Sequence, residues 1–137
     1  MKLIDTHTHL YVEAFDEDRD QVIEKAIAVG VERFYLPAID STYTARMLDL
    51  EKKYPDHIRL MMGLHPTHVK ENYKEELLHV EQFLAKRNFA AVGEIGIDLY
   101  WDKSFLKQQQ EAFDAQISWA KEKELPIVIH CRDAFDE

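Results

Sequence analysis

The segment FAAVGEIG, residues 89–96, is apolar on both faces of an extended chain except for one carboxylate, Glu94. Continuous apolar runs of this kind are typical of parallel sheets, which helices cover on both faces. Four other short runs of β-forming residues recur along the chain: KLIDT (2–6), RFYLPAI (33–39), IRLMMG (58–63) and PIVIH (126–130). We therefore expect five strands of a parallel sheet.

Segments with helical spacing of apolar residues separate these runs. They cover about residues 19–29, 42–54, 75–87 and 104–122. Gly30 suits the C-terminal cap of the first helix, Pro55 ends the second, and Ser104 is a candidate N-cap for the last. Strands that alternate with helices predict the α/β class, and the 137 residues fit a single domain.

The composition is that of a globular protein, with 46% apolar residues and a net charge of −9. This charge opposes broad attraction to a polyanion, although bound cations could still hold a phosphate-containing substrate. No apolar run approaches the ~20 residues of a membrane-spanning helix, and no secretory signal pattern opens the chain. We expect a cytoplasmic protein without a membrane partner. The single cysteine, Cys131, allows no intrachain disulfide and should pack under a helix.

The segment LIDTHTHL, residues 3–10, places two histidines directly after an apolar run. Asp5, His7 and His9 would share one face of an extended strand. Two imidazoles on one face can chelate a metal, and a nearby carboxylate can orient a ligand. The alternative is two polar residues at a strand end that bond to water or backbone, and this motif alone does not separate the two.

Seven residues able to carry chemistry fall at the carboxyl ends of the predicted strands: His7, His9, His65, Glu94, Asp98, His130 and Arg132. In parallel α/β folds, and in the (β/α)8 barrel especially, these ends build the active site. We therefore expect the seven residues to gather in one place.

Each residue also has a simpler interpretation. A lone carboxylate in an apolar strand is costly to bury, so Glu94 is more readily explained as a metal ligand. Gly93 and Gly96 beside it should allow another strand to approach closely. His130 alone could equally be a core histidine, but the other candidates favour ligation. His65 could fix a turn or bond a substrate oxygen. The segments 16–20 and 108–110 are expected to be solvated helix surface.

Taken together, the motifs DTHTHL, GLHPTH, VGEIGIDLYWD and IVIHCRDA resemble, in order along the whole chain, the TatD-type metal-dependent deoxyribonucleases of the amidohydrolase-like superfamily. The resemblance implies a TIM-type (β/α)8 barrel, with about the first five β/α units in residues 1–137. It also implies a role for each matching residue: His7, His9, Glu94 and His130 as metal ligands, Glu94 as the catalytic carboxylate, and His65 and Arg132 as contacts to the substrate phosphate.

The same resemblance implies one or two divalent ions, either zinc, manganese, magnesium or iron, and DNA as substrate, single-stranded or at an end. The family's further histidine after the sixth strand and aspartate after the eighth have no counterpart here. A complete barrel typically needs about 250 residues, so we expect an incomplete barrel with little activity alone and a tendency to self-associate through open strand edges. Asp98 is the nearest substitute for the aspartate, but a structural or substrate contact is favoured.

Two alternatives stay open. One is a metal-dependent hydrolase of another ester or a cyclic amide, because the same constellation can activate water against several electrophiles. The other is a non-catalytic metal-binding fragment that needs a complementary chain. Hydrolysis of single-stranded DNA against small esters tests the first, and metal binding paired with native mass tests the second.

Overall fold

The computed structural model describes residues 1–137 as an α/β fold. The strands are β1 (Leu3–Asp5), β2 (Val31–Leu36), β3 (Ile58–Leu60), β4 (Val92–Asp98) and β5 (Ile127–Arg132). The helices are α1 (Arg19–Ala28), α2 (Thr44–Lys53), α3 (Tyr73–Lys86) and α4 (Leu106–Glu122). Short 3-10 turns lie in the connections at Glu13–Phe15, Ser41–Tyr43 and Pro66–His68. The expected alternation of strands and helices is confirmed.

All paired strands are parallel and neighbour one another in chain order, as β1-β2-β3 and as β4-β5. An isolated bridge between Met62 and Val92 joins the two groups, and the Gly93 amide donates to the Met62 carbonyl there at 2.9 Å. Parallel strands in sequential order are the arrangement of a (β/α)8 barrel. The fold is therefore a part of such a barrel, as the sequence predicts.

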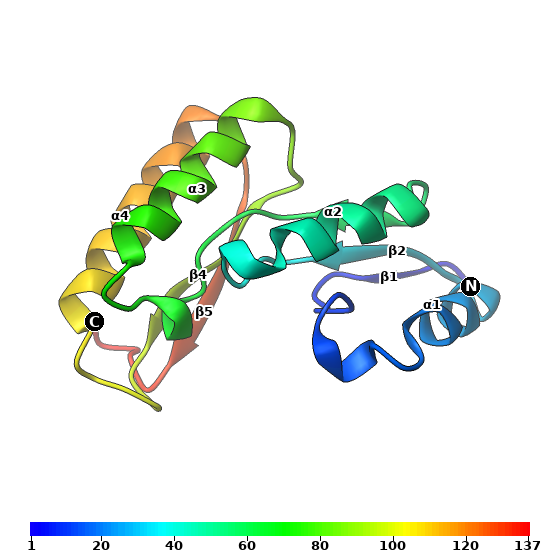
Figure 1. Ribbon diagram of the computed structural model, residues 1–137, viewed down its shortest axis with the longest axis horizontal. Coiled ribbons are helices and arrows are strands. Elements are labelled where there is room, and N and C mark those ends of the chain that lie inside the picture. Colours follow the sequence, from blue (N-terminus) through cyan, green and yellow to red (C-terminus); the bar gives the residue numbers. More distant parts are fainter.

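The helices lie along the strands in two groups. Figure 1 shows α1 and α2 beside β1 and β2, and α3 and α4 beside β4 and β5 at the other end of the molecule. Each helix contributes buried side chains to one apolar core, among them Ile23 of α1, Met47 of α2, Val80 of α3 and Ala112 of α4. This packing holds the strand ends in place. None of the helices has the length and apolarity to cross a membrane.

Two local predictions are wrong. Strand β1 ends at Asp5, so His7 and His9 lie in the turn after the strand and not on its face. The N-cap of α4 is Phe105, because Ser104 turns back and donates its backbone N–H to the Asp102 carboxylate at 2.8 Å. The chain therefore reaches α4 through a turn that Asp102 holds.

The prediction for Cys131 is also wrong. It lies on β5 next to His130, and successive strand residues point to opposite faces. His130 turns toward Glu94, while the Cys131 thiol is exposed. Burial of Cys131 would need a helix over this side of β5, but its exposure shows that none of α1 to α4 covers it.

Candidate metal centre

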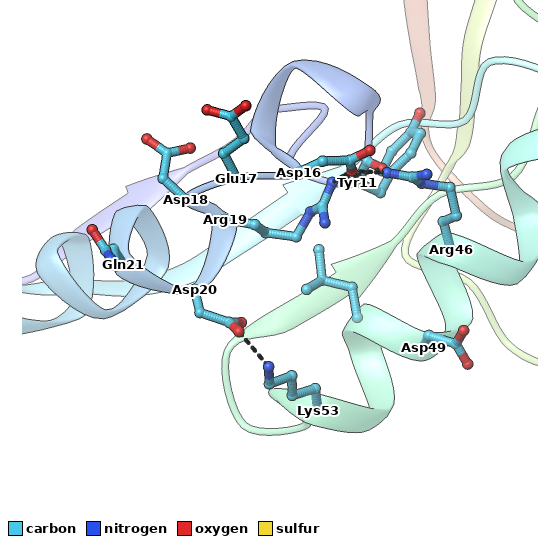
Figure 2. A pocket seen from close by; sticks show the side chains of 11 residues that line it. Tyr11, Asp16, Glu17, Asp18, Arg19, Asp20, Gln21, Arg46, Asp49 and Lys53 are labelled. Carbon is cyan, nitrogen blue, oxygen red and sulfur yellow. Dashed lines mark hydrogen bonds and ion pairs between the residues drawn. The ribbon is translucent and has the colours of Figure 1, made fainter.

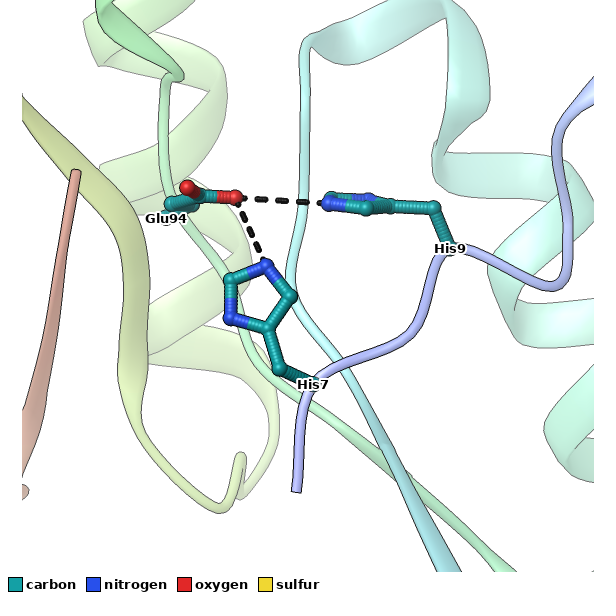
Figure 3. A group of neighbouring side chains, drawn as sticks. All are labelled: His7, His9 and Glu94. Atoms are coloured by element: carbon teal, nitrogen blue, oxygen red, sulfur yellow. Dashed lines mark ion pairs between the residues drawn. The ribbon is translucent and has the colours of Figure 1, made fainter. Parts of the chain in front are cut away.

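Glu94 lies at the centre of the strand ends and is only 6% exposed. Its Oε2 atom lies 3.1 Å from His7 Nε2 and 3.3 Å from His9 Nε2 (Figure 3). Its other oxygen, Oε1, lies 3.0 Å from His130 Nδ1 and 3.5 Å from His65 Nε2. One buried carboxylate thus faces two imidazoles with each oxygen, and these come from β5 and from the connections after β1 and β3.

The hydrogen bonds of His9 identify its protonated nitrogen. The Tyr11 hydroxyl donates its single proton to the Pro37 carbonyl at 2.5 Å, so toward His9 it accepts. His9 Nδ1 lies 3.0 Å from that hydroxyl and therefore carries the ring proton. In the neutral ring, Nε2 then presents a lone pair to the Glu94 oxygen. Two facing lone pairs repel each other unless a cation or a proton lies between them.

His130 lies between two carboxylates. Its Nε2 is 2.7 Å from Asp98 Oδ2, and Asp98 is only 2% exposed. A proton on Nε2 satisfies this shorter contact and leaves the Nδ1 lone pair toward Glu94. A buried carboxylate that bonds the outer nitrogen of an imidazole is the usual partner of a metal-binding histidine.

In His65, unlike in His9 and His130, the ring nitrogen that faces Glu94 carries the proton. Its Nδ1 accepts the Thr67 backbone N–H at 3.2 Å, because a backbone amide can only donate. The neutral ring then carries its proton on Nε2, which points toward Glu94 Oε1. His65 is therefore arranged as a hydrogen-bond donor beside the carboxylate, which suits a contact to a substrate oxygen better than metal ligation.

Asp5 positions the first histidine through the backbone. Its carboxylate accepts the His7 backbone N–H at 3.2 Å. Asp5 thus holds the backbone of His7 and not its imidazole ring. The aspartate instead shapes the turn that carries His7 toward Glu94.

The electrostatics favour a charged Glu94. Burial raises the pKa of the Glu94 carboxyl, but the facing His65, His9 and His7 rings lower it by more. The pKa therefore stands well below its usual range. A carboxylate that faces the lone-pair nitrogens of His9 and His130 suits a divalent cation of the zinc, manganese or iron type.

Two sets of atoms are close enough to share an ion: His7, His9 and Glu94, and His65, Glu94 and His130. Glu94 belongs to both sets, so it would be a shared ligand if each set held an ion. The donor polarity of His65 leaves Glu94 and His130 as the protein ligands of the second set.

Close approach of β4 and β5 brings Glu94 and His130 together. Gly96 has a φ of +143°, and a Cβ there would lie 1.9 Å from the His130 carbonyl oxygen. A Cβ on Gly93 would lie 2.7 Å from Val128 Cβ. The sequence expectation that these glycines allow close backbone contact is confirmed.

Two buried glutamines of α4 were missed, because segment 108–110 was expected to be solvated. Gln109 accepts the Asp98 N–H at 2.8 Å and donates to the Asp98 carbonyl at 3.0 Å. Gln116 accepts the Leu64 N–H at 2.7 Å, just before His65. Their spacing of seven residues, two helical turns, was the available signal. Both glutamines hold backbone that carries the site.

Arg132 lies at the rim of the site, on the same side of β5 as His130. Its guanidinium carbon is 3.6 Å from the centre of the Tyr100 ring. The guanidinium has no hydrogen bond or ion pair within the chain, so its donors are available to an anion. Figure 1 places β5 next to β4, which carries Glu94 and Asp98.

A separate cavity of about 520 Å³ lies between α1 and α2 (Figure 2). Asp16 is paired there with Arg19 at 2.7 Å and with Arg46, and Asp20 is paired with Lys53 at 2.5 Å. Segment 16–20 is exposed, as expected, but two of its carboxylates are held by cations. Arg19 and Arg46 also donate to the Tyr11 carbonyl. This network therefore supports the residue that orients His9.

The family model described as TatD related DNase matches residues 4–137. The chain belongs to this TatD-related family. The uncharacterized metal-dependent hydrolase YabD of Bacillus subtilis is 39% identical over 135 residues, which is 98% of this chain and 52% of YabD. The 3'-5' ssDNA/RNA exonuclease TatD of Erwinia tasmaniensis is 31% identical over 134 residues, covering 98% of this chain and 52% of that protein.

A solved TatD-related structure agrees with the fold. The crystal structure of YjjV, a TatD homologue from Escherichia coli, superposes with a TM-score of 0.86 at 33% identity. The match covers 96% of this chain and 51% of YjjV. The chain thus spans about half the length of the TatD-related proteins it matches.

Proposed function

We propose that this chain carries the centre of a metal-dependent hydrolase that cleaves phosphodiester bonds in single-stranded DNA or RNA. The observation that carries the proposal is the buried Glu94 carboxylate, which faces two imidazoles with each oxygen. The TatD-related membership supports metal-dependent hydrolysis. The exonuclease name of the Erwinia relative supports the nucleic-acid substrate.

The residues that fit a metal are His7, His9, Glu94 and His130. A divalent ion held by such ligands would lower the pKa of bound water to near neutral and would polarise a phosphoryl oxygen. Glu94 would contribute one carboxylate oxygen to each of the two ligand sets. Asp98 would keep the proton of His130 on Nε2, and Tyr11 would keep that of His9 on Nδ1.

Two other residues would bind the substrate. His65 Nε2–H points into the site and would donate to a phosphate oxygen. Arg132 presents unpaired guanidinium donors at the rim, where a second phosphate oxygen or the next phosphate would bind. Asp98 bonds both His130 and the Tyr100 amide, so it is a positioning residue and not the base that takes the water proton.

The test is a digestion series with a 5'-labelled single-stranded oligonucleotide and manganese, magnesium or zinc. It uses this chain and, where the coding sequence continues, the longer polypeptide. We expect metal-dependent shortening of the strand by the longer polypeptide, little by residues 1–137 alone, and none by the longer polypeptide that carries Glu94→Gln. A small carboxylic ester and a cyclic amide serve as competing substrates. Cleavage of either one without cleavage of the oligonucleotide would reject the phosphodiester proposal and favour the alternative hydrolase.

We also propose that the polypeptide of residues 1–137 self-associates through strand edges. Strands β1 and β5 each pair on one side only. Ile4 on β1 and Ile129 on β5 are 54% and 55% exposed. Exposed apolar strand edges are templates for pairing with another chain. Sedimentation should show oligomers of this polypeptide, and a compact monomer at all concentrations would contradict the proposal.

A further inference from the structure

Tyr100, Trp101 and Arg132 form an exposed aromatic platform at the rim of the candidate metal centre. The Tyr100 and Trp101 rings meet edge to face, with centroids 4.8 Å apart. The Arg132 guanidinium carbon lies 3.6 Å from the Tyr100 centroid and 5.5 Å from that of Trp101. Trp101 is 72% exposed and Tyr100 is 51% exposed.

Two hydrogen bonds and one strand tie this platform to the metal centre. The Tyr100 amide donates to Asp98 Oδ1 at 3.0 Å, while Asp98 Oδ2 holds His130. The Leu99 amide donates to the Arg132 carbonyl at 3.0 Å. Arg132 follows His130 by two residues on β5, a distance of roughly 7 Å along a strand. The platform is thus placed within one or two nucleotide units of the site.

Because Trp101 is exposed, its side chain does not contribute to folding the free energy that burial would provide. A tryptophan side chain gains free energy when it leaves water, and an exposed aromatic cluster commonly marks a binding site. The core does not require Trp101, because the small apolar cluster beneath this region consists of Ile97, Leu99 and Ala134. The cation beside the rings adds a preference for an aromatic ligand that carries negative charge.

We propose that the Tyr100–Trp101–Arg132 platform stacks a nucleobase of a single-stranded nucleic acid, with Arg132 contacting the adjacent phosphate. This inference rests on the proposed function and adds the contact that selects an unpaired base. Every base has a π-face, so such stacking tolerates many sequences but requires a base that has left the duplex. The net charge of −9 provides no broad attraction to a polyanion, so local contacts of this kind must supply affinity.

Fluorescence provides a direct test. The chain has two tryptophans, Trp101 and Trp119. In a Trp119→Phe background Trp101 is the only indole, and stacking of a base on it should quench its emission. Titration uses an octathymidylate and an abasic octamer of the same length and charge. It is done without metal and, with phosphorothioate-linked versions that resist cleavage, with manganese. We expect saturable quenching by the octathymidylate and little by the abasic octamer.

Affinity provides the second test. Trp101→Ala should weaken binding of the octathymidylate about 5- to 100-fold, the range expected for loss of one stacked base. Binding of the abasic octamer should change less than twofold. Trp101→Tyr should recover part of the loss. Leu78→Ala, which removes an exposed apolar side chain on α3, is the matched control and should change neither affinity.

The outcomes separate this inference from the proposed function. Base-dependent quenching together with no metal-dependent cleavage by the longer polypeptide would leave the platform in place and reject the nuclease. Cleavage with equal affinity for the octathymidylate and the abasic octamer, or with no quenching in either condition, would overturn the platform alone. A Trp101→Ala variant that changes the oligomeric state and not the affinity would also overturn it, since the platform would then be a protein contact.

Discussion

The metal centre and the cavity between α1 and α2 are both crowded with ionisable groups, yet they are built in opposite ways. In the cavity, exposed Asp16 and Asp20 each have a cation of the chain as partner, Arg46 for one and Lys53 for the other (Figure 2). In the candidate metal centre, buried Glu94 has no lysine or arginine beside it and faces four histidines. Figure 3 shows two of them, His7 and His9.

The difference distinguishes charges that are paired within the chain from a charge that could bind a ligand. An exposed ion pair is complete as it stands and contributes little net free energy. A buried carboxylate that faces the lone-pair nitrogens of His9 and His130 is incomplete, because desolvation is costly without a cation. The candidate metal centre therefore offers a cation more than the cavity does, although the cavity is the more open space. Tyr11 belongs to both regions, with its carbonyl in one and its hydroxyl in the other.

The largest effect is expected for Glu94→Gln. Loss of the charge removes a ligand from both sets of metal-binding atoms, so metal affinity should fall more than the roughly 10- to 100-fold typical of an outer partner. Titration with zinc in competition with a chelator measures this. Asp20→Asn, which removes an equally charged group from the cavity, is the control. If the Glu94→Gln and Asp20→Asn variants bound zinc with equal affinity, the two regions would not differ in metal binding.

A somewhat smaller effect is expected for His7→Ala. This ring belongs to only one of the two sets, and its polar contact is with Glu94 of the same set. Occupancy of that set should fall, with an affinity loss of roughly 100-fold, while the thermal unfolding of the metal-free chain stays close to that of the parent. Metal content by mass spectrometry and thermal melts test both parts. Strong destabilisation with unchanged metal content would mean that His7 is structural.

Tyr11→Phe tests the link between the regions. It removes the hydroxyl that accepts from His9, so metal affinity should fall about tenfold. The unpaired Pro37 carbonyl and His9 N–H should also lower the free energy of unfolding by about 1–3 kcal/mol. Tyr54→Phe is the matched control, since it removes a hydroxyl that donates to Asp20 in the cavity. A loss of metal affinity of the same size in the control would show that the effect is not specific to His9.

The smallest effect is expected for Asp20→Asn itself. Asp20 accepts from Lys53 and Tyr54, and these hydrogen bonds lower the pKa of its carboxyl, but the group is exposed. We expect unchanged metal affinity and a slight loss of stability that disappears at high salt, because salt screens surface pairs. Chemical denaturation at two salt concentrations checks this. A clear loss of metal affinity would show that the cavity takes part in the site.

Several features could be predicted from local sequence. The parallel α/β class followed from apolar runs that alternate with helical spacing, and Gly93 and Gly96 correctly indicated close strands. The predictions that failed concern side-chain surroundings. Gln109 looks like a polar surface residue until its helix is placed against β4, and Cys131 looks buried until β5 is seen without a covering helix.

The sequence by itself determined which residues could serve a metal and that they stand at strand ends, because both depend on residue type and on the period of the chain. Only the tertiary structure decided their roles. Glu94 faces two pairs of rings because four segments meet at one point. Tyr11, Asp98 and Thr67 set the proton positions of His9, His130 and His65 through contacts that follow from packing. The tautomer of each histidine and the position of Glu94 in both ligand sets depend on interatomic distances between segments, which no local sequence pattern encodes.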